Sequence, residues 1–104
     1  MINLEKFDKS VESFTWSAQP IGVRFTSSLP ITVHEVKSLL AEEKGVRKGY
    51  VLKSFGDDKR LLHVEELVKK GKQADEILEC LQRFLEKMPL YREEKGIELM
   101  TGRV

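Results

Sequence analysis

Gly56, Asp57 and Asp58 form the stretch with the clearest potential for chemistry, because two adjacent carboxylates can bind a divalent metal ion. A catalytic two-metal site needs a further carboxylate from a distant strand and a large domain around its substrates. The flanking segments 49–55 and 59–64 have the composition of strands. Aspartate is also a common turn residue, and its carboxylate accepts hydrogen bonds from nearby backbone amides. We therefore predict a hairpin turn here and no metal site.

The other residues with catalytic potential do not form a recognisable set. His34 and His63 are the two histidines and Cys80 is the single thiol, and their spacing is not that of zinc ligands. Cys80 falls between Leu78 and Leu81 in an apolar helical pattern, which favours a small buried side chain over a reactive thiol. No phosphate-binding glycine loop or serine nucleophile motif is present. The sequence predicts no catalytic residues, cofactor or metal. The alternative is a small enzyme with a pocket at a dimer interface, which a single sequence does not reveal.

Positive charge is concentrated in the middle third of the chain. Residues 44–72 carry nine basic and four acidic side chains, a net charge of +5, whereas the whole chain carries +1. A sheet that exposes basic and aromatic side chains can bind single-stranded nucleic acid. Tyr50 and Phe55 supply aromatic rings, although strand alternation places them on opposite faces. The alternative is a solvated basic face. The residues that would contact nucleic acid are Arg47, Lys48, Lys53, Lys59 and Arg60.

The longest helical pattern covers residues 65–88, where apolar side chains recur at spacings of three, four or seven. Gly71 can break this helix in two, and Pro89 ends it. The apolar stripe is wider than one small sheet face needs, which favours an association surface. We expect it to bind a second copy in a twofold dimer, or a larger protein. The alternative is a core helix in a monomer. The predicted interface residues are Ile77, Leu81, Phe84 and Met88.

Local signals assign the N-terminal segments. Leu4 and Phe7 stand at helical spacing and favour a short helix over residues 2–9. Residues 11–17 are rich in strand-forming side chains, and residues 21–27 alternate as a strand with one buried face.

The middle of the chain carries stronger signals. Thr32 and Glu35 form the capping-box pattern of a helix over residues 32–45, and Gly45 is the residue type that commonly ends one. The remaining predicted strands are 49–55, 59–64 and 96–100.

This order is that of a ferredoxin-like α+β domain with an N-terminal extension, in which two helices cover one face of an antiparallel sheet. If residues 11–17 instead pair with 21–27 as a hairpin, the order is that of a β-grasp fold. We expect one domain over residues 1–104, because a chain of 104 residues suffices for one compact unit.

Residues 23–46, VRFTSSLPITVHEVKSLLAEEKGV, resemble the strand-to-helix section of ubiquitin-like proteins. In that family a helix led by threonine carries apolar residues and a lysine at similar offsets. The chain lacks the terminal Gly-Gly used for conjugation, since it ends Thr101-Gly102-Arg103-Val104. The resemblance therefore implies a β-grasp shape and not a protein modifier.

Composition limits the compartment. A single cysteine cannot form an internal disulfide, which favours a reducing compartment and predicts a cytoplasmic protein. No apolar run approaches the roughly 20 residues of a membrane span, so we expect no membrane partner.

Overall fold

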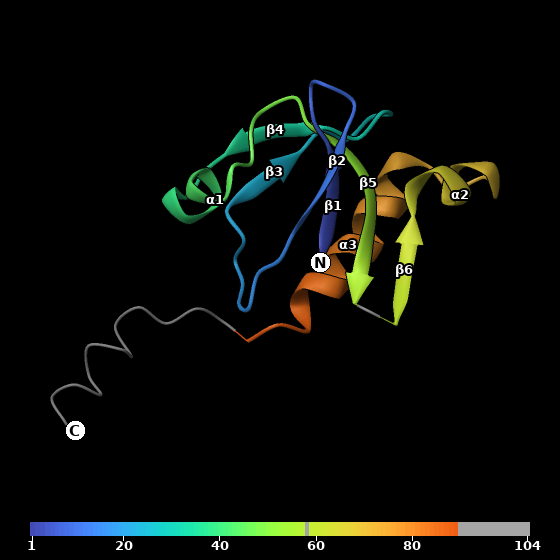
Figure 1. Cartoon of the computed structure of the whole chain (residues 1–104). Coiled ribbons are helices and arrows are strands. Elements are labelled where there is room, and N and C mark those ends of the chain that lie inside the picture. The colour runs from blue at the N-terminus through green and yellow to red at the C-terminus, as the bar shows by residue number, and fades with distance from the viewer. Residues whose placement is uncertain (58, 90–104) are drawn as a thin grey trace, which may run out of the picture.

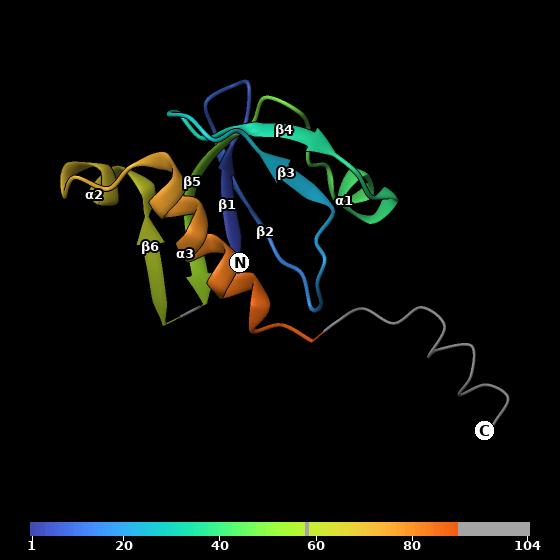
Figure 2. The same ribbon diagram turned by 180° about the vertical axis from the view of Figure 1, so that it is seen from behind.

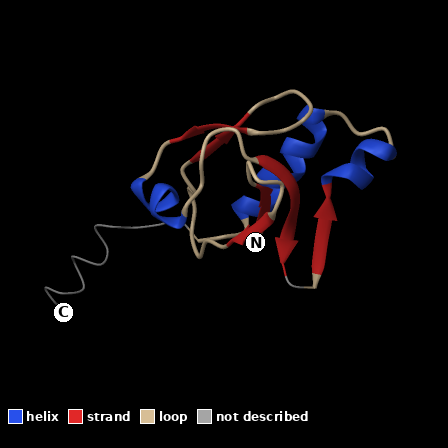
Figure 3. Cartoon of the chain, turned by 45° about the horizontal axis from the view of Figure 1, so that its top comes forward, coloured by secondary structure: helices blue, strands red, loops and turns tan. Residues whose placement is uncertain are grey.

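Residues 1–57 and 59–89 are described by the structure, a computed structural model, and they fold into two antiparallel sheets and three helices. The elements are β1 (Ile2–Glu5), β2 (Val11–Phe14), β3 (Val23–Phe25), β4 (Val33–Val36), α1 (Leu39–Lys44), β5 (Val51–Asp57), β6 (Arg60–His63), α2 (Val64–Lys69) and α3 (Ala74–Glu86). The larger sheet has the order β2-β1-β5-β6, and the smaller sheet pairs β3 with β4 (Figure 1). The helices α1 and α2 lie at opposite ends of the molecule (Figure 3).

The N-terminal segment is a strand, so the helix predicted over residues 2–9 is wrong. Ile2 and Leu4 are each 1% exposed, whereas Phe7 is 65% exposed. β1 is an inner strand that pairs with β2 on one side and β5 on the other. Between these two buried side chains, the Asn3 side-chain amide donates to the Ser54 hydroxyl over 2.8 Å. Pairing on both edges outweighs the weak helical spacing of Leu4 and Phe7.

The helix predicted over residues 32–45 is correct only in its last part. Residues 33–36 form β4, which pairs with β3, so Thr32 does not cap a helix. α1 begins at Leu39, and the Ser38 hydroxyl caps it by accepting the Ala41 amide over 3.0 Å. The predicted stop at Gly45 is confirmed, because this residue adopts the left-handed conformation with φ of 100°.

The hairpin predicted around Gly56 is confirmed. β5 and β6 pair in antiparallel register, with Asp57 opposite Arg60. One Asp57 carboxylate oxygen accepts the backbone amides of Lys59 and Arg60 over 3.0 and 2.9 Å. This aspartate therefore acts as the turn residue that the sequence predicted, and Asp58 lies outside the described residues.

The long helical pattern is divided at Gly71, which answers a question that the sequence left open. α2 ends at Lys69, Gly71 has a φ of 92°, and α3 begins at Ala74. α3 crosses one face of the larger sheet (Figure 2). Its Ile77 and Leu81 side chains join the buried core, which also contains Phe55.

The structure confirms an α+β architecture with an antiparallel sheet, but it does not confirm the ferredoxin-like order. The strand predicted over 21–27 lies in the smaller sheet, at β3. The hairpin between 11–17 and 21–27, on which the β-grasp alternative depends, is wrong because β2 pairs with β1. The predicted strand 96–100 lies outside the described residues.

In the ranges 1–57 and 59–89, none of the helices has the length and apolar character needed to cross a membrane.

Candidate functional site

The five basic residues predicted to contact nucleic acid lie around different hollows of the surface. Arg47 and Lys48 line one beside His34, and Lys53 lines another beside α2. Arg60 lines a third, and Lys59 lies in the β5–β6 turn.

The two aromatic residues of this segment are not exposed. Tyr50 is 6% exposed and Phe55 is 0% exposed. Base stacking needs an open aromatic face, so neither ring supplies a stacking platform in this conformation.

The four predicted interface residues of α3 pack largely on their own chain. Ile77 is 0% exposed and Leu81 is 3% exposed. Phe84 and Met88 are half-buried and pack against the same core, with the Phe84 ring centroid 6.3 Å from that of Phe55. Burial against the larger sheet thus accounts for most of the apolar stripe, and the predicted dimer interface remains a prediction for the two half-buried side chains.

The two histidines and the cysteine, which have catalytic potential, lie on three different elements. His34 and His63 are exposed on β4 and β6, and Cys80 is half-buried on α3. Among residues 1–57 and 59–89, no three His, Cys, Asp or Glu side chains are grouped so that they could hold a metal ion.

A groove lies between β3 and the C-terminal half of α3, and we call it the β3–α3 groove. It has a volume of about 250 Å³. Its lining is partly apolar and also includes two cationic side chains and two side-chain amides. The residues that line it include Ile21, Val23, Arg24, Lys37, Gln82 and Leu85.

Backbone groups on the outer edge of β3 are unpaired next to this groove. The Lys37 amide donates to the Gly22 carbonyl, and the Thr26 amide donates to the Thr32 carbonyl, both towards β4. Hydrogen-bonded pairs alternate along an antiparallel ladder, so the backbone of Val23 and Phe25 faces away from β4. Among residues 1–57 and 59–89, no backbone hydrogen bond joins Val23 or Phe25 to an element other than β4. In the smaller sheet formed by the described residues, β3 pairs with β4 alone and is therefore an edge strand.

The loop before β3 is fixed at both of its ends. The Gln19 backbone amide donates to the Pro89 carbonyl over 2.8 Å. Its side-chain amide donates to the Met88 carbonyl, also over 2.8 Å. Gly22 has a φ of 75°, and a Cβ at this position would lie 2.3 Å from the Ser38 hydroxyl oxygen. Glycine is therefore required for β3 to approach α1 at this point.

The rim charges are only partly compensated. Arg24 Nη1 lies 3.7 Å from Glu35 Oε1, and both side chains are more than half exposed. This ion pair therefore contributes little to stability, and each side chain can exchange partners. Among the described residues, Lys37 has no ion-pair partner within 4.0 Å.

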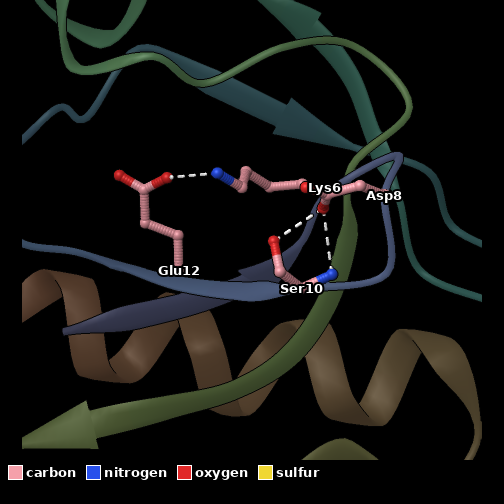
Figure 4. Close-up of polar contacts among 4 residues, drawn as sticks. All are labelled: Lys6, Asp8, Ser10 and Glu12. Atoms are coloured by element: carbon pink, nitrogen blue, oxygen red, sulfur yellow. Dashed lines mark hydrogen bonds and ion pairs between the residues drawn. The ribbon is translucent and has the colours of Figure 1, made fainter.

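The two side chains with shifted pKa values, Lys6 and Asp8, lie outside this groove, in the turn between β1 and β2 (Figure 4). Lys6 Nζ lies 3.1 Å from Glu12 Oε1, and the hydrogen bond and charge of Glu12 raise the pKa of Lys6. The Ser10 hydroxyl and backbone amide donate to Asp8 Oδ1 over 2.6 and 3.0 Å, and these bonds lower the pKa of Asp8. These four residues do not line the β3–α3 groove.

Two other hollows present apolar surface. One of about 500 Å³ lies between Leu29, β5 and α2. Another of about 580 Å³ lies beside Trp16, Leu39 and Leu40, and the two leucines are 69% and 52% exposed. The β3–α3 groove is smaller, but it lies beside the backbone groups of β3 that face away from β4.

The sequence prediction missed this site. The alternation over residues 21–27 did reveal a strand with one buried face. It carried no information on which edge of that strand would be paired, because partners of a strand are distant in sequence.

Comparison of the chain with protein-family models, with curated proteins and with solved structures found no match.

Proposed function

We propose that this protein is a protein-binding module that takes up an extended segment of a partner as an additional strand on the outer edge of β3. The observation that carries this proposal is the unpaired backbone of Val23 and Phe25 beside the β3–α3 groove. In strand addition, main-chain hydrogen bonds supply affinity, and pockets for alternate side chains supply specificity. An edge strand with an adjacent pocket meets both requirements.

The two faces of β3 indicate the chemistry of the partner. Val23 and Phe25 pack towards the core, and Leu85 of α3 lines the groove on that side. Arg24 points to the other face, where it is exposed. Side chains directly opposite one another on neighbouring strands interact, and opposite charges are favourable there. The expected partner segment alternates apolar residues, which face the groove, with acidic residues, which face Arg24 and Lys37.

The homodimer and the single-stranded nucleic-acid interaction remain less supported proposals. The first depends on the half-buried Phe84 and Met88, because Ile77 and Leu81 are occupied by the core. The second depends on basic side chains that line separate hollows.

A selection experiment tests the proposed function. The purified chain of residues 1–104 is presented with a displayed library of linear twelve-residue peptides, and enriched peptides are synthesised for fluorescence anisotropy. We expect alternating apolar and acidic residues among them. Val23→Pro removes the outward amide of β3, and the loss of one backbone hydrogen bond weakens binding by roughly three- to tenfold.

The matched control is Val11→Pro, because the Val11 backbone faces the outer edge of β2 by the same alternation. It should leave peptide affinity unchanged. Unfolding curves of both variants show whether the fold is retained. An absence of enriched peptides, or equal affinity of folded Val23→Pro and the wild type, would exclude binding at this edge.

A further inference from the structure

A larger hollow, which we call the Trp16 hollow, lies where the chain after β2 meets α1. It has a volume of about 580 Å³, and its lining includes Trp16, Pro20, Leu39, Leu40 and Lys44. Ligand pockets commonly enclose roughly 300–1,000 Å³ and are mainly apolar, with a few polar groups. Of the described residues that line it, Pro20 alone also lines the β3–α3 groove. The two sites are therefore largely separate.

Two adjacent leucines of α1 give the Trp16 hollow an exposed apolar surface. Leu39 is 69% exposed and Leu40 is 52% exposed. Single exposed apolar residues are common on protein surfaces, but these two lie in one hollow with the half-buried indole of Trp16. A contiguous apolar surface of this kind indicates binding.

The Trp16 ring contacts both the core and α1. Its centroid lies 6.4 Å from that of the core residue Phe14, and Lys44 Nζ of α1 lies 5.6 Å from the indole centroid. The indole N–H is covered from solvent and finds no acceptor among residues 1–57 and 59–89. A covered donor without an acceptor is unfavourable, so a small shift of the ring towards a bound acceptor would be favoured.

The charge of the Trp16 hollow is positive. Lys44 is the one charged side chain among the described residues that line it. No carboxylate of residues 1–57 and 59–89 forms an ion pair with this ammonium. Lys44 stands four residues after Leu40, so the two side chains are neighbours on the helix surface. The arrangement fits a ligand with an apolar body and one negative charge.

A membrane surface also combines apolar and anionic groups, but two features of the Trp16 hollow argue against it. α1 has six residues, whereas many helices that lie in a membrane interface have about 20–30 residues and are rich in basic side chains. Anionic bilayers are recognised by clusters of basic residues, and one lysine adds little. A hollow with a single cation is better matched to a monomeric ligand.

We propose that the Trp16 hollow binds the anion of an apolar monocarboxylic acid, such as a medium-chain fatty acid. The carboxylate accepts hydrogen bonds from the Lys44 ammonium and from the indole N–H, which thereby gains the acceptor that it lacks. The hydrocarbon body packs on Leu39 and Leu40 and removes their surface from water. This site is independent of strand addition at β3.

Intrinsic fluorescence measures this binding directly, because Trp16 is the single tryptophan of the chain. Decanoate is titrated into the protein of residues 1–104 below its micelle concentration. We expect a saturable shift of the emission to shorter wavelength, since the ligand replaces water at the ring. Decan-1-ol lacks the charge and should bind about tenfold more weakly. Decylammonium carries the opposite charge and should bind more weakly than the alcohol.

Variants separate the contacts of the carboxylate from those of the hydrocarbon body. Lys44→Met keeps an apolar stem and removes the ammonium, so it should weaken decanoate binding about tenfold and leave decan-1-ol binding unchanged. Leu40→Gln should weaken the binding of both ligands about threefold, because apolar contact area is lost. Trp16→Phe removes the N–H, and calorimetry should show about threefold weaker binding of decanoate alone.

The matched control is Lys69→Met, which removes one cation from the hollow between Leu29, β5 and α2. It should change the affinity for neither ligand. Thermal unfolding followed by circular dichroism shows whether each variant retains the fold. The comparison of decanoate, decan-1-ol and decylammonium needs only the wild type and decides the role of charge even where a variant fails to fold.

The inference would be overturned by an emission that shows no saturable change, or by equal wild-type affinity for the acid and the alcohol. Unchanged decanoate affinity in folded Lys44→Met or Trp16→Phe, or an equal loss in Lys69→Met, would also overturn it. Binding to phosphatidylglycerol vesicles without binding to monomeric decanoate would identify a membrane surface as the occupant and reject the soluble ligand.

Discussion

At the scale of single residues, two glycines with left-handed backbone conformations differ in what surrounds them. Gly56 has a φ of 145° and Gly71 a φ of 92°. A Cβ at Gly56 would lie 2.1 Å from the Arg60 carbonyl oxygen across the hairpin, whereas a Cβ at Gly71 would meet no atom within 4 Å. The first glycine permits a close approach of two strands, and the second only ends a helix.

This contrast predicts different effects of the same substitution. Gly71→Ala should destabilise the protein by about 1 kcal/mol, because only backbone strain is added. Gly56→Ala should cost roughly 3 kcal/mol or more, since the hairpin must also move apart. Urea unfolding of both variants measures the difference in the free energy of unfolding. Equal losses would show that the approach at Gly56 is looser than the structure indicates.

At the scale of elements, the start of α1 is set by Ser38 and not by Thr32. The Ser38 hydroxyl accepts the Ala41 amide. The Thr32 backbone is instead engaged in the smaller sheet, where its amide donates to the Thr26 hydroxyl over 3.0 Å. The capping-box pattern of Thr32 and Glu35 is a local signal, and the pairing of β4 with β3 overrides it.

Removal of each hydroxyl distinguishes the two helix starts. Ser38→Ala should lower the free energy of unfolding by about 1 kcal/mol, because a helix N-cap is lost. Thr32→Ala removes the hydroxyl that the sequence pattern predicted as the helix cap, and it should lower the free energy of unfolding by less than Ser38→Ala does. Thermal unfolding followed by circular dichroism compares the two variants. A larger loss for Thr32→Ala would contradict the observed helix start.

At the scale of the whole molecule, the contact between α3 and the larger sheet organises the core. Ile77, Leu81 and Phe55 belong to one buried cluster that also includes Ile2 and Leu4 of β1. The helix is thus held by strands from the start and the middle of the chain. The same contact leaves the C-terminal half of α3 beside β3, which creates the groove.

Truncation of the central side chain tests this role of α3. Ile77→Ala should destabilise the protein by about 2–5 kcal/mol, the range for large cavities in a packed core. The unfolding midpoints of the wild type and the variant should not depend on protein concentration, because the side chain packs within its own chain. A wild-type midpoint that rises with concentration would instead indicate that association stabilises the fold and would favour the homodimer.

Much of the site was beyond prediction from the sequence. The alternation around Val23 and the turn at Asp57 were found, and so was the helical pattern that carries Leu85. The predicted site residues followed charge and apolar width instead, and two of them, Ile77 and Leu81, proved to be buried. Exposure depends on what covers a residue, and the covering elements come from elsewhere in the chain.

The sequence by itself determined the features that depend on a few neighbouring residues: the hairpin at Gly56 and the helix end at Gly45. Steric limits on the backbone and short-range hydrogen bonds suffice for these. The sequence left open whether the helix continues through Gly71. Only the tertiary structure decided that residues 2–5 and 33–36 are strands, and that β3 keeps an open edge beside α3. The physical reason is that strand pairing joins segments distant in sequence, so its free energy appears in no local pattern.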